Sequence, residues 1–215
     1  MTWRLPLLLL AALLCLVPAA GAHTVMFQRL VHVRIQPEGM EVAMAITIHA
    51  GPEALRLRQR FDLDGDEELS RDEQDQLANW LDAEAFRDFA IHVQGDPVSL
   101  DGRERFLELT QNHRSDLGEG LRFRSVHEGR LLLRPGARQV VLHEAPGNAR
   151  EMIALRLDLH EGLELTKSDG REGASRLVPA AQQSWQGLIR GVPGDFVLDL
   201  QVSRLGLSPD DAAPR

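Results

Sequence analysis

The sequence predicts a mainly β protein: a β-sandwich-like domain that carries one helix-loop-helix between its early strands. Three observations lead to this prediction. Two runs of alternating apolar and polar residues stand near the start of the chain, a stretch with helical spacing follows them, and many short alternating runs fill the rest. A strand with one buried face alternates with a period of two, whereas the apolar residues of an amphipathic helix recur every three or four positions.

The first two runs predict a β-hairpin. In residues 25–35 apolar residues such as Val33 fall in one phase, while His32 and Arg34 fall in the other. Residues 40–48 repeat the alternation after the sequence Gln-Pro-Glu-Gly. Two period-two runs joined by a Pro- and Gly-containing turn are typical of a hairpin with one buried face.

A helix pair is expected next. Pro52 suits the first turn of a helix, which the spacing continues to Phe61. Beyond an acidic stretch, Leu77, Leu81 and Phe86 follow helical spacing on one face, with Asp82 among the polar residues elsewhere. The acidic stretch is therefore predicted to lie between two helices.

The rest of the chain returns to short strands and turns. The polar, Gly-rich segment 168–175 predicts a loop, Asp101-Gly102 predicts a turn, and the sequence gives no basis for the strand order. The strand candidates are residues 89–93, 98–100, 105–110, 121–126, 130–134, 138–143, 153–159, 164–167 and 196–202. The predicted division is a signal peptide (1–22), the N-terminal hairpin of the β domain (23–50), the helix-loop-helix (51–89), the remainder of the β-sandwich domain (90–205) and a disordered tail (206–215).

The first residues have the pattern of an export signal. Arg4 precedes an apolar run over residues 5–17, and a small-residue cleavage site ends at Ala22. The apolar run is too short for a membrane span. Cleavage near Ala22 predicts a periplasmic or secreted protein that begins at His23 and that has lost Cys15, the one cysteine of the sequence, so that no disulfide supports its fold.

Charge and motif content argue against several classes of function. The formal net charge of −8 is unfavourable for binding to nucleic acid, which is itself polyanionic. The sequence contains neither a G-x-S-x-G nucleophile elbow nor a Gly-rich phosphate loop. We therefore expect a protein that is not an enzyme, with no catalytic residues and no organic cofactor.

The acidic stretch 62–73 holds the residues that indicate chemistry. Carboxylate, carbonyl and hydroxyl oxygens are the ligands that Ca²⁺ prefers, and a short loop can wrap them around the ion. The alternative is a solvated acidic turn, in which so many carboxylates would repel one another. The candidate metal ligands are the side chains of Asp62, Asp64, Asp66 and Glu73, the backbone carbonyl of Glu68, and Ser70 acting directly or through water.

With Asp62, Asp64 and Asp66 at its first, third and fifth positions and Glu73 at its twelfth, this loop resembles the EF-hand calcium-binding family. The resemblance covers the loop and its flanking helices and implies a single EF-hand in an exported bacterial protein, with calcium as the bound ion and a structural or adaptor role. The sixth position, normally Gly, is occupied by Glu67, which should cost about 1 kcal/mol of backbone strain. The resemblance also implies a weak site, with a Kd on the order of 10⁻⁴ to 10⁻³ M.

Two other functions stay open. After cleavage His23 would carry both an imidazole and a free α-amine, which together can chelate copper, as in exported β-sandwich copper proteins. The first half of the chain also looks like the exported head regions of bacterial membrane proteins linked to nickel handling. The protein would then be a soluble partner of a metal-transport membrane complex, with an unidentified membrane protein as its partner.

Overall fold

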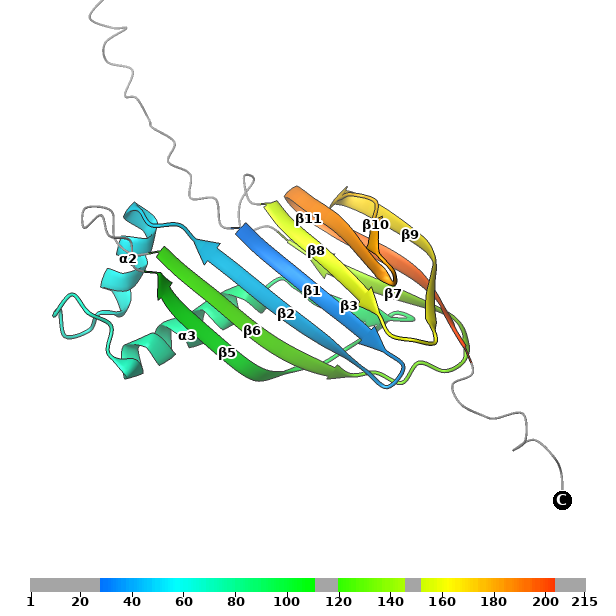
Figure 1. The fold of residues 1–215 in the computed structure, drawn as a ribbon, viewed down its shortest axis with the longest axis horizontal. Helices are drawn as coiled ribbons and strands as arrows, with labels where there is room; N and C mark the ends of the chain where they lie inside the picture. The colour runs from blue at the N-terminus through cyan, green and yellow to red at the C-terminus, as the bar shows by residue number, and fades with distance from the viewer. Residues whose placement is uncertain (1–27, 111–119, 146–151, 204–215) are drawn as a thin grey trace, which may run out of the picture.

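The computed structural model describes residues 28–110, 120–145 and 152–203, which form a curled β-sheet with a pair of helices at one end (Figure 1). The expected fold class, a mainly β, sandwich-like domain with a helical insertion, is confirmed. In the described ranges the helices are α2 (Pro52–Phe61) and α3 (Arg71–Phe86). The strands are β1 (Gln28–Gln36), β2 (Gly39–Ile48), β3 (Ala90–Val93), β4 (Asp96–Pro97), β5 (Leu100–Thr110), β6 (Gly120–Arg130), β7 (Gly136–Glu144), β8 (Met152–Leu159), β9 (Leu163–Ala174), β10 (Val178–Ala181) and β11 (Ser184–Val202).

One continuous hydrogen-bonded sheet makes both layers of the sandwich. Its strand order is β4-β3-β7-β11-β8-β1-β2-β6-β5, and β9 and β10 also pair with β11. The long strand β11 joins the layers, because residues 184–190 pair with β8 whereas residues 194–202 pair with β7 on one side and β9 on the other. Most neighbours are antiparallel, but β1 and β8 are parallel.

The predicted hairpin is present as β1 and β2, which pair antiparallel from Gln36 opposite Gly39 outward. Its alternation sorts the side chains as expected: Val33 and Ile35 are completely buried, whereas His32 and Arg34 lie on the outer face. The same rule applies to β2, where Met44 is buried. Apolar side chains from both layers and from the two helices form one core.

The helices begin and end close to the predicted positions. Helix α2 starts with Pro52 in its first turn and ends at Phe61. Helix α3 packs against β5 and β6 and buries Leu77 and Leu81 in the shared core. The helix pair thus covers one end of the sheet and holds the acidic loop at the edge of the molecule (Figure 1).

A buried ion pair ties α3 to both layers. Arg29 at the start of β1 lies 2.6 Å from Glu144 at the end of β7, Nη1 to Oε1, and only 10% and 4% of the two side chains are exposed. The same Arg29 nitrogen donates to the carbonyl of Ala85, in the last turn of α3, at 3.4 Å. A cation at a helix C-terminus also interacts favourably with the helix dipole.

Three local predictions were wrong. The segment 168–175, predicted as a loop, continues strand β9 to Ala174, because the ladder with β11 supplies backbone hydrogen bonds that its composition does not reveal. Residues 131–134 are not strand; instead Leu133 donates its N–H to the Pro37 carbonyl at 2.9 Å, next to the hairpin turn. The Asp-Gly pair at 101–102, which reads as a turn, lies within β5 beside a register shift. The predicted signal peptide and tail lie outside the described residues.

Candidate metal centre

The acidic loop brings the three aspartates of the predicted site together. Asp62, Asp64 and Asp66 each offer a carboxylate oxygen, and these oxygens lie within 4.8 Å of one another. Among the residues that the structure describes, this is the group of acidic, His or Cys side chains that could hold a metal ion. Asp62 is half-buried at the end of α2, whereas Asp64 and Asp66 are exposed, so an ion could reach the group from solvent.

Backbone hydrogen bonds to the aspartates give the loop its shape. The two oxygens of Asp62 accept from the N–H groups of Gly65 at 2.7 Å and Glu67 at 3.0 Å. Asp66 accepts from the N–H of Glu68 at 2.8 Å. The predicted ligand atom of Glu68 is its carbonyl oxygen, which is not part of this contact. Asp side chains commonly bond to the backbone a few residues ahead and so form turns.

Glu67 adopts the left-handed conformation that the sixth position of such a loop requires. Its φ is 68°, close to the 74° of Gly65. Its N–H donates to Asp62, and its carbonyl accepts from Arg58 of α2 at 3.5 Å. A non-Gly residue in this conformation carries about 1 kcal/mol of backbone strain.

Glu73 joins the two ends of the loop. Its Oε1 accepts from the N–H of Leu63 at 2.6 Å, and its Oε2 accepts from the N–H and the hydroxyl of Ser70, both at 2.8 Å. Ser70 is the N-cap of α3, and with Glu73 it forms a capping box. The sequence Ser-x-x-Glu is the signature of a capping box. The interpretation of Ser70 and Glu73 as metal ligands alone did not include this role.

The two ends of the site differ in electrostatic environment. Hydrogen bonds from the Leu63 N–H, the Ser70 hydroxyl and the Ser70 N–H hold the pKa of Glu73 below its usual value. At Asp64 the Asp66 N–H lowers the pKa, but desolvation and the negative charges of Asp66, Glu73 and Asp62 outweigh it, so the pKa is raised. Glu73 is thus a fixed carboxylate, while the aspartates carry a mutual repulsion that a cation would relieve.

Apolar contacts fix the loop to the body of the protein. Leu69 is buried in the core, and Gln74 donates its side-chain amide to the Leu69 carbonyl at 2.6 Å. Before and after the loop, the Phe61 and Trp80 rings pack with centroids 5.9 Å apart. The loop therefore connects two helices that contact each other through these rings.

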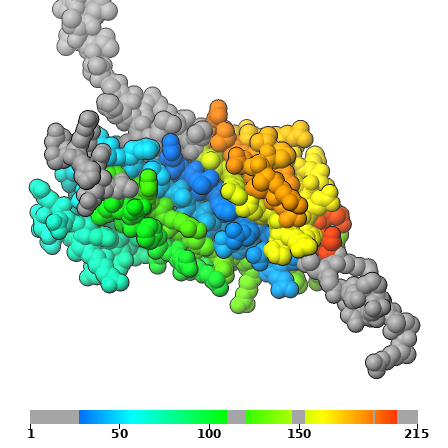
Figure 2. All heavy atoms as spheres, in the orientation of Figure 1, coloured from blue at the N-terminus to red at the C-terminus, as the bar shows by residue number. Residues whose placement is uncertain are grey.

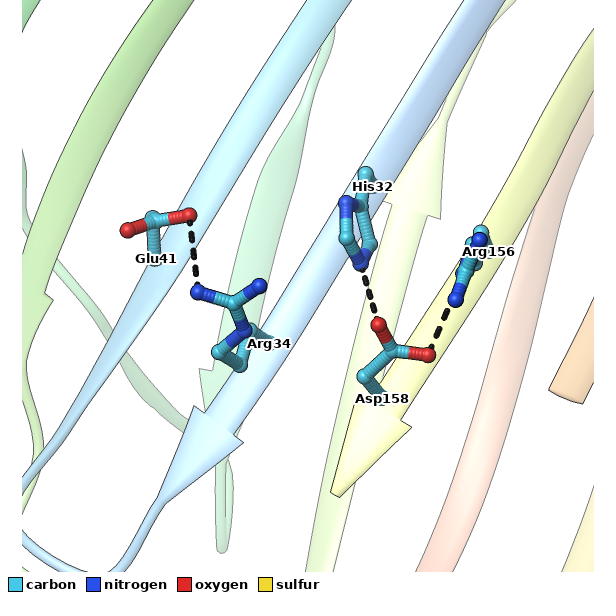
Figure 3. A network of polar contacts seen from close by, with 5 residues as sticks. All are labelled: His32, Arg34, Glu41, Arg156 and Asp158. Carbon is cyan, nitrogen blue, oxygen red and sulfur yellow. Dashed lines mark hydrogen bonds and ion pairs between the residues drawn. The ribbon is translucent and has the colours of Figure 1, made fainter. Parts of the chain in front are cut away.

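A second polar cluster lies on the outer face of the sheet (Figure 3). His32 Nε2 is 2.6 Å from Asp158 Oδ2, and Arg156 donates from Nε to the other carboxylate oxygen at 3.2 Å. Burial raises the pKa of Asp158, but the Ser184 hydroxyl, His32 and Arg156 together bring it below its usual value. Sequence reasoning missed this cluster, because the parallel pairing of β1 with β8 brings together residues that are far apart in the chain.

Other predicted features cannot be placed. His23, the candidate copper ligand, and the cleavage site near Ala22 lie outside the described residues. Within the described ranges neither helix has the length and apolar character needed to cross a membrane.

Comparisons with known proteins add little to the geometry. No family model matches the chain, and no curated protein matches it. Among solved structures, the chain is similar to AChBP from Bulinus truncatus, with 7% identity over 84% of this chain and 90% of that one. The TM-score of 0.22 is too low to support any conclusion about fold or function.

Proposed function

We propose that the protein is an exported calcium-binding protein with a single EF-hand-like site in the loop Asp62 to Glu73. The observation that carries the proposal is the convergence of oxygens from Asp62, Asp64 and Asp66 within 4.8 Å, in a loop between two helices. Further support comes from the left-handed backbone at Glu67, which suits the tight turn of such a loop.

The proposed ligands have distinct tasks. The three aspartates supply anionic oxygens, and the ion offsets the repulsion that raises the pKa of Asp64. Glu73 closes the loop, while the Glu68 carbonyl and Ser70, directly or through water, complete the oxygen shell that Ca²⁺ needs. Because Glu73 already accepts hydrogen bonds from Leu63 and Ser70, the ion must compete with these donors.

This competition favours weak binding. We propose a Kd on the order of 10⁻⁴ to 10⁻³ M, the range of extracellular modules, which matches an exported location better than cytosolic sensing. The role is structural: an ion that binds only the folded protein would add ~2.7 kcal/mol to the free energy of unfolding at 100 times its Kd. Export is part of the proposal, and an adaptor role toward a membrane protein is the alternative to the structural role.

The proposal is tested by thermal unfolding in millimolar Ca²⁺ and in chelator. We expect Ca²⁺ to raise the melting temperature of the natural protein, and Asp64→Asn to remove most of that rise. Asp72→Asn is the matched control, because Asp72 is an exposed acid next to Glu73, in the first turn of α3, that is not a proposed ligand. Mg²⁺ is a second control, since it demands a more rigid octahedral shell. An identical response of both variants to Ca²⁺ would refute the assignment.

A further inference from the structure

A groove lies on the outer face of the sheet, remote in sequence from the acidic loop. Its walls come from β1, β8, β11 and the segment between β9 and β10, and its volume is about 520 Å³. That size falls within the 300–1,000 Å³ usual for small-molecule sites. In Figure 2 the atoms of β1 (blue), β8 (yellow) and β10 (orange) lie on the face toward the viewer.

The groove is formed by paired backbone. Ser175 donates its N–H to the Leu188 carbonyl at 2.7 Å, and the Leu188 N–H donates to the Ser175 hydroxyl at 2.9 Å. Next to it, Val178 of β10 pairs with Gln186 of β11. These contacts hold the segment that leads into β10 against β11. The groove is therefore formed by the strand pairing of the fold itself.

The surface of the groove is largely apolar. Leu30 and Val178 line the groove, and they are 44% and 57% exposed, respectively. Ala154 and Leu188 also contribute to its lining. Exposed large apolar residues that share one concave surface indicate a binding site more strongly than scattered ones do.

Two guanidinium groups border this apolar surface. Arg156 uses its Nε on Asp158, which leaves its terminal nitrogens available for other acceptors. For the side chain of Arg176, the described part of the chain provides no ion-pair partner. Two guanidinium groups against the single carboxylate of Asp158 leave a local excess of positive charge beside an apolar surface, in a protein with a formal net charge of −8. Guanidinium groups are suited to carboxylates, which they bind through two hydrogen bonds.

We infer that this groove binds a small amphipathic anion, an alkyl chain that ends in a carboxylate. The alkyl chain lies on Leu30, Val178 and Leu188, and the carboxylate lies between Arg156 and Arg176. The inference is independent of the proposed calcium site, because none of the groove residues belongs to the acidic loop or its helices.

The test is a titration of the full chain with sodium octanoate, followed by NMR of the Leu, Val and Ala methyl groups. We expect saturable shifts confined to Leu30, Ala154, Val178 and Leu188, with no shift at Leu132, which is 77% exposed but outside the groove. Octylammonium, with the same chain length and the opposite charge, should bind more weakly. Results in Ca²⁺ and in chelator should agree.

Two exposed-arginine variants complete the test. Arg176→Gln should weaken octanoate binding about two- to fivefold, the effect of one solvent-exposed ion pair. Arg122→Gln, on another part of the sheet, should leave binding unchanged. Equal binding of octanoate and octylammonium, equal effects of the two variants, shifts spread over the whole surface, or no saturation in the millimolar range would each overturn the inference.

Discussion

Asp82 of α3 and His127 of β6 are 2.9 Å apart, Oδ1 to Nε2, and connect the helical insertion to the sheet. Only 16% of the Asp82 side chain and 12% of the His127 side chain are exposed. The His127 ring also packs on Phe86, with centroids 3.8 Å apart. This contact fixes the helix that follows the acidic loop, so it contributes to the position of the candidate metal site.

Breaking this contact should destabilise the protein. We expect Asp82→Ala to lower the free energy of unfolding by about 1–2 kcal/mol, because it leaves the largely buried His127 imidazole without this hydrogen-bond partner. Denaturant unfolding of Asp82→Ala, His127→Ala and the double variant measures the coupling between the two residues. Purely additive effects would show that the residues do not interact.

The buried pair of Arg29 and Glu144 should be more sensitive. Replacing Arg29 by Met leaves the Glu144 carboxylate buried without that cation and should cost about 3–5 kcal/mol of stability. Replacing both, as Arg29→Met with Glu144→Leu, should cost less than Arg29→Met alone, since no charge is then left behind. Chemical unfolding of both variants checks this order, and a larger loss in the double variant would contradict the explanation.

Asp158 gives the outer face of the sheet a pH dependence. Because its pKa is lowered in the folded protein, its ionised form favours folding above the unfolded pKa of about 3.9, and that contribution is lost as the pH falls through the folded pKa. We expect Asp158→Asn to reduce stability at pH 6 by up to about 1 kcal/mol, the range for partly exposed pairs. The difference from the natural protein should shrink below pH 4. A difference that stays constant with pH would refute the assignment.

The N-cap role of Ser70 can be separated from any role in metal binding. Ser70→Ala should lower stability by about 1 kcal/mol in chelator, through loss of the hydrogen bond to the start of α3. Ser70→Gly, a better N-cap than Ala, should cost only a few tenths of that. Thermal or denaturant unfolding without calcium measures both, and an unchanged stability of Ser70→Ala would argue that the hydroxyl does not cap the helix.

Local periodicity predicted the parts of the structure that depend on local sequence. The hairpin and both helices follow from apolar spacing, and the aspartate cluster follows from loop spacing. Contacts between distant strands did not follow. Asp82 appears on the polar face of its helix, and only packing on β6 reveals its partner.

The same limit explains why the sequence wrongly predicted a loop for segment 168–175. Segment 168–175 is polar and Gly-rich, yet pairing with β11 makes it a strand, with Glu172 opposite Gly194. The polar cluster of His32 and Asp158 joins residues that are 126 positions apart in the sequence. Helical and strand periodicities describe only local sequence and cannot predict such a contact. Sequence patterns report which face of an element is apolar, whereas the partner of that face depends on the whole fold.

The most direct test of the central claim is calcium titration by isothermal calorimetry on chelator-treated protein. The account predicts one bound Ca²⁺ per chain with a Kd on the order of 10⁻⁴ to 10⁻³ M, strongly weakened by Asp62→Asn or Glu73→Gln and unchanged by Asp72→Asn. Absence of binding at 10 times this concentration range, or binding that survives in the Asp62 and Glu73 variants, would contradict it.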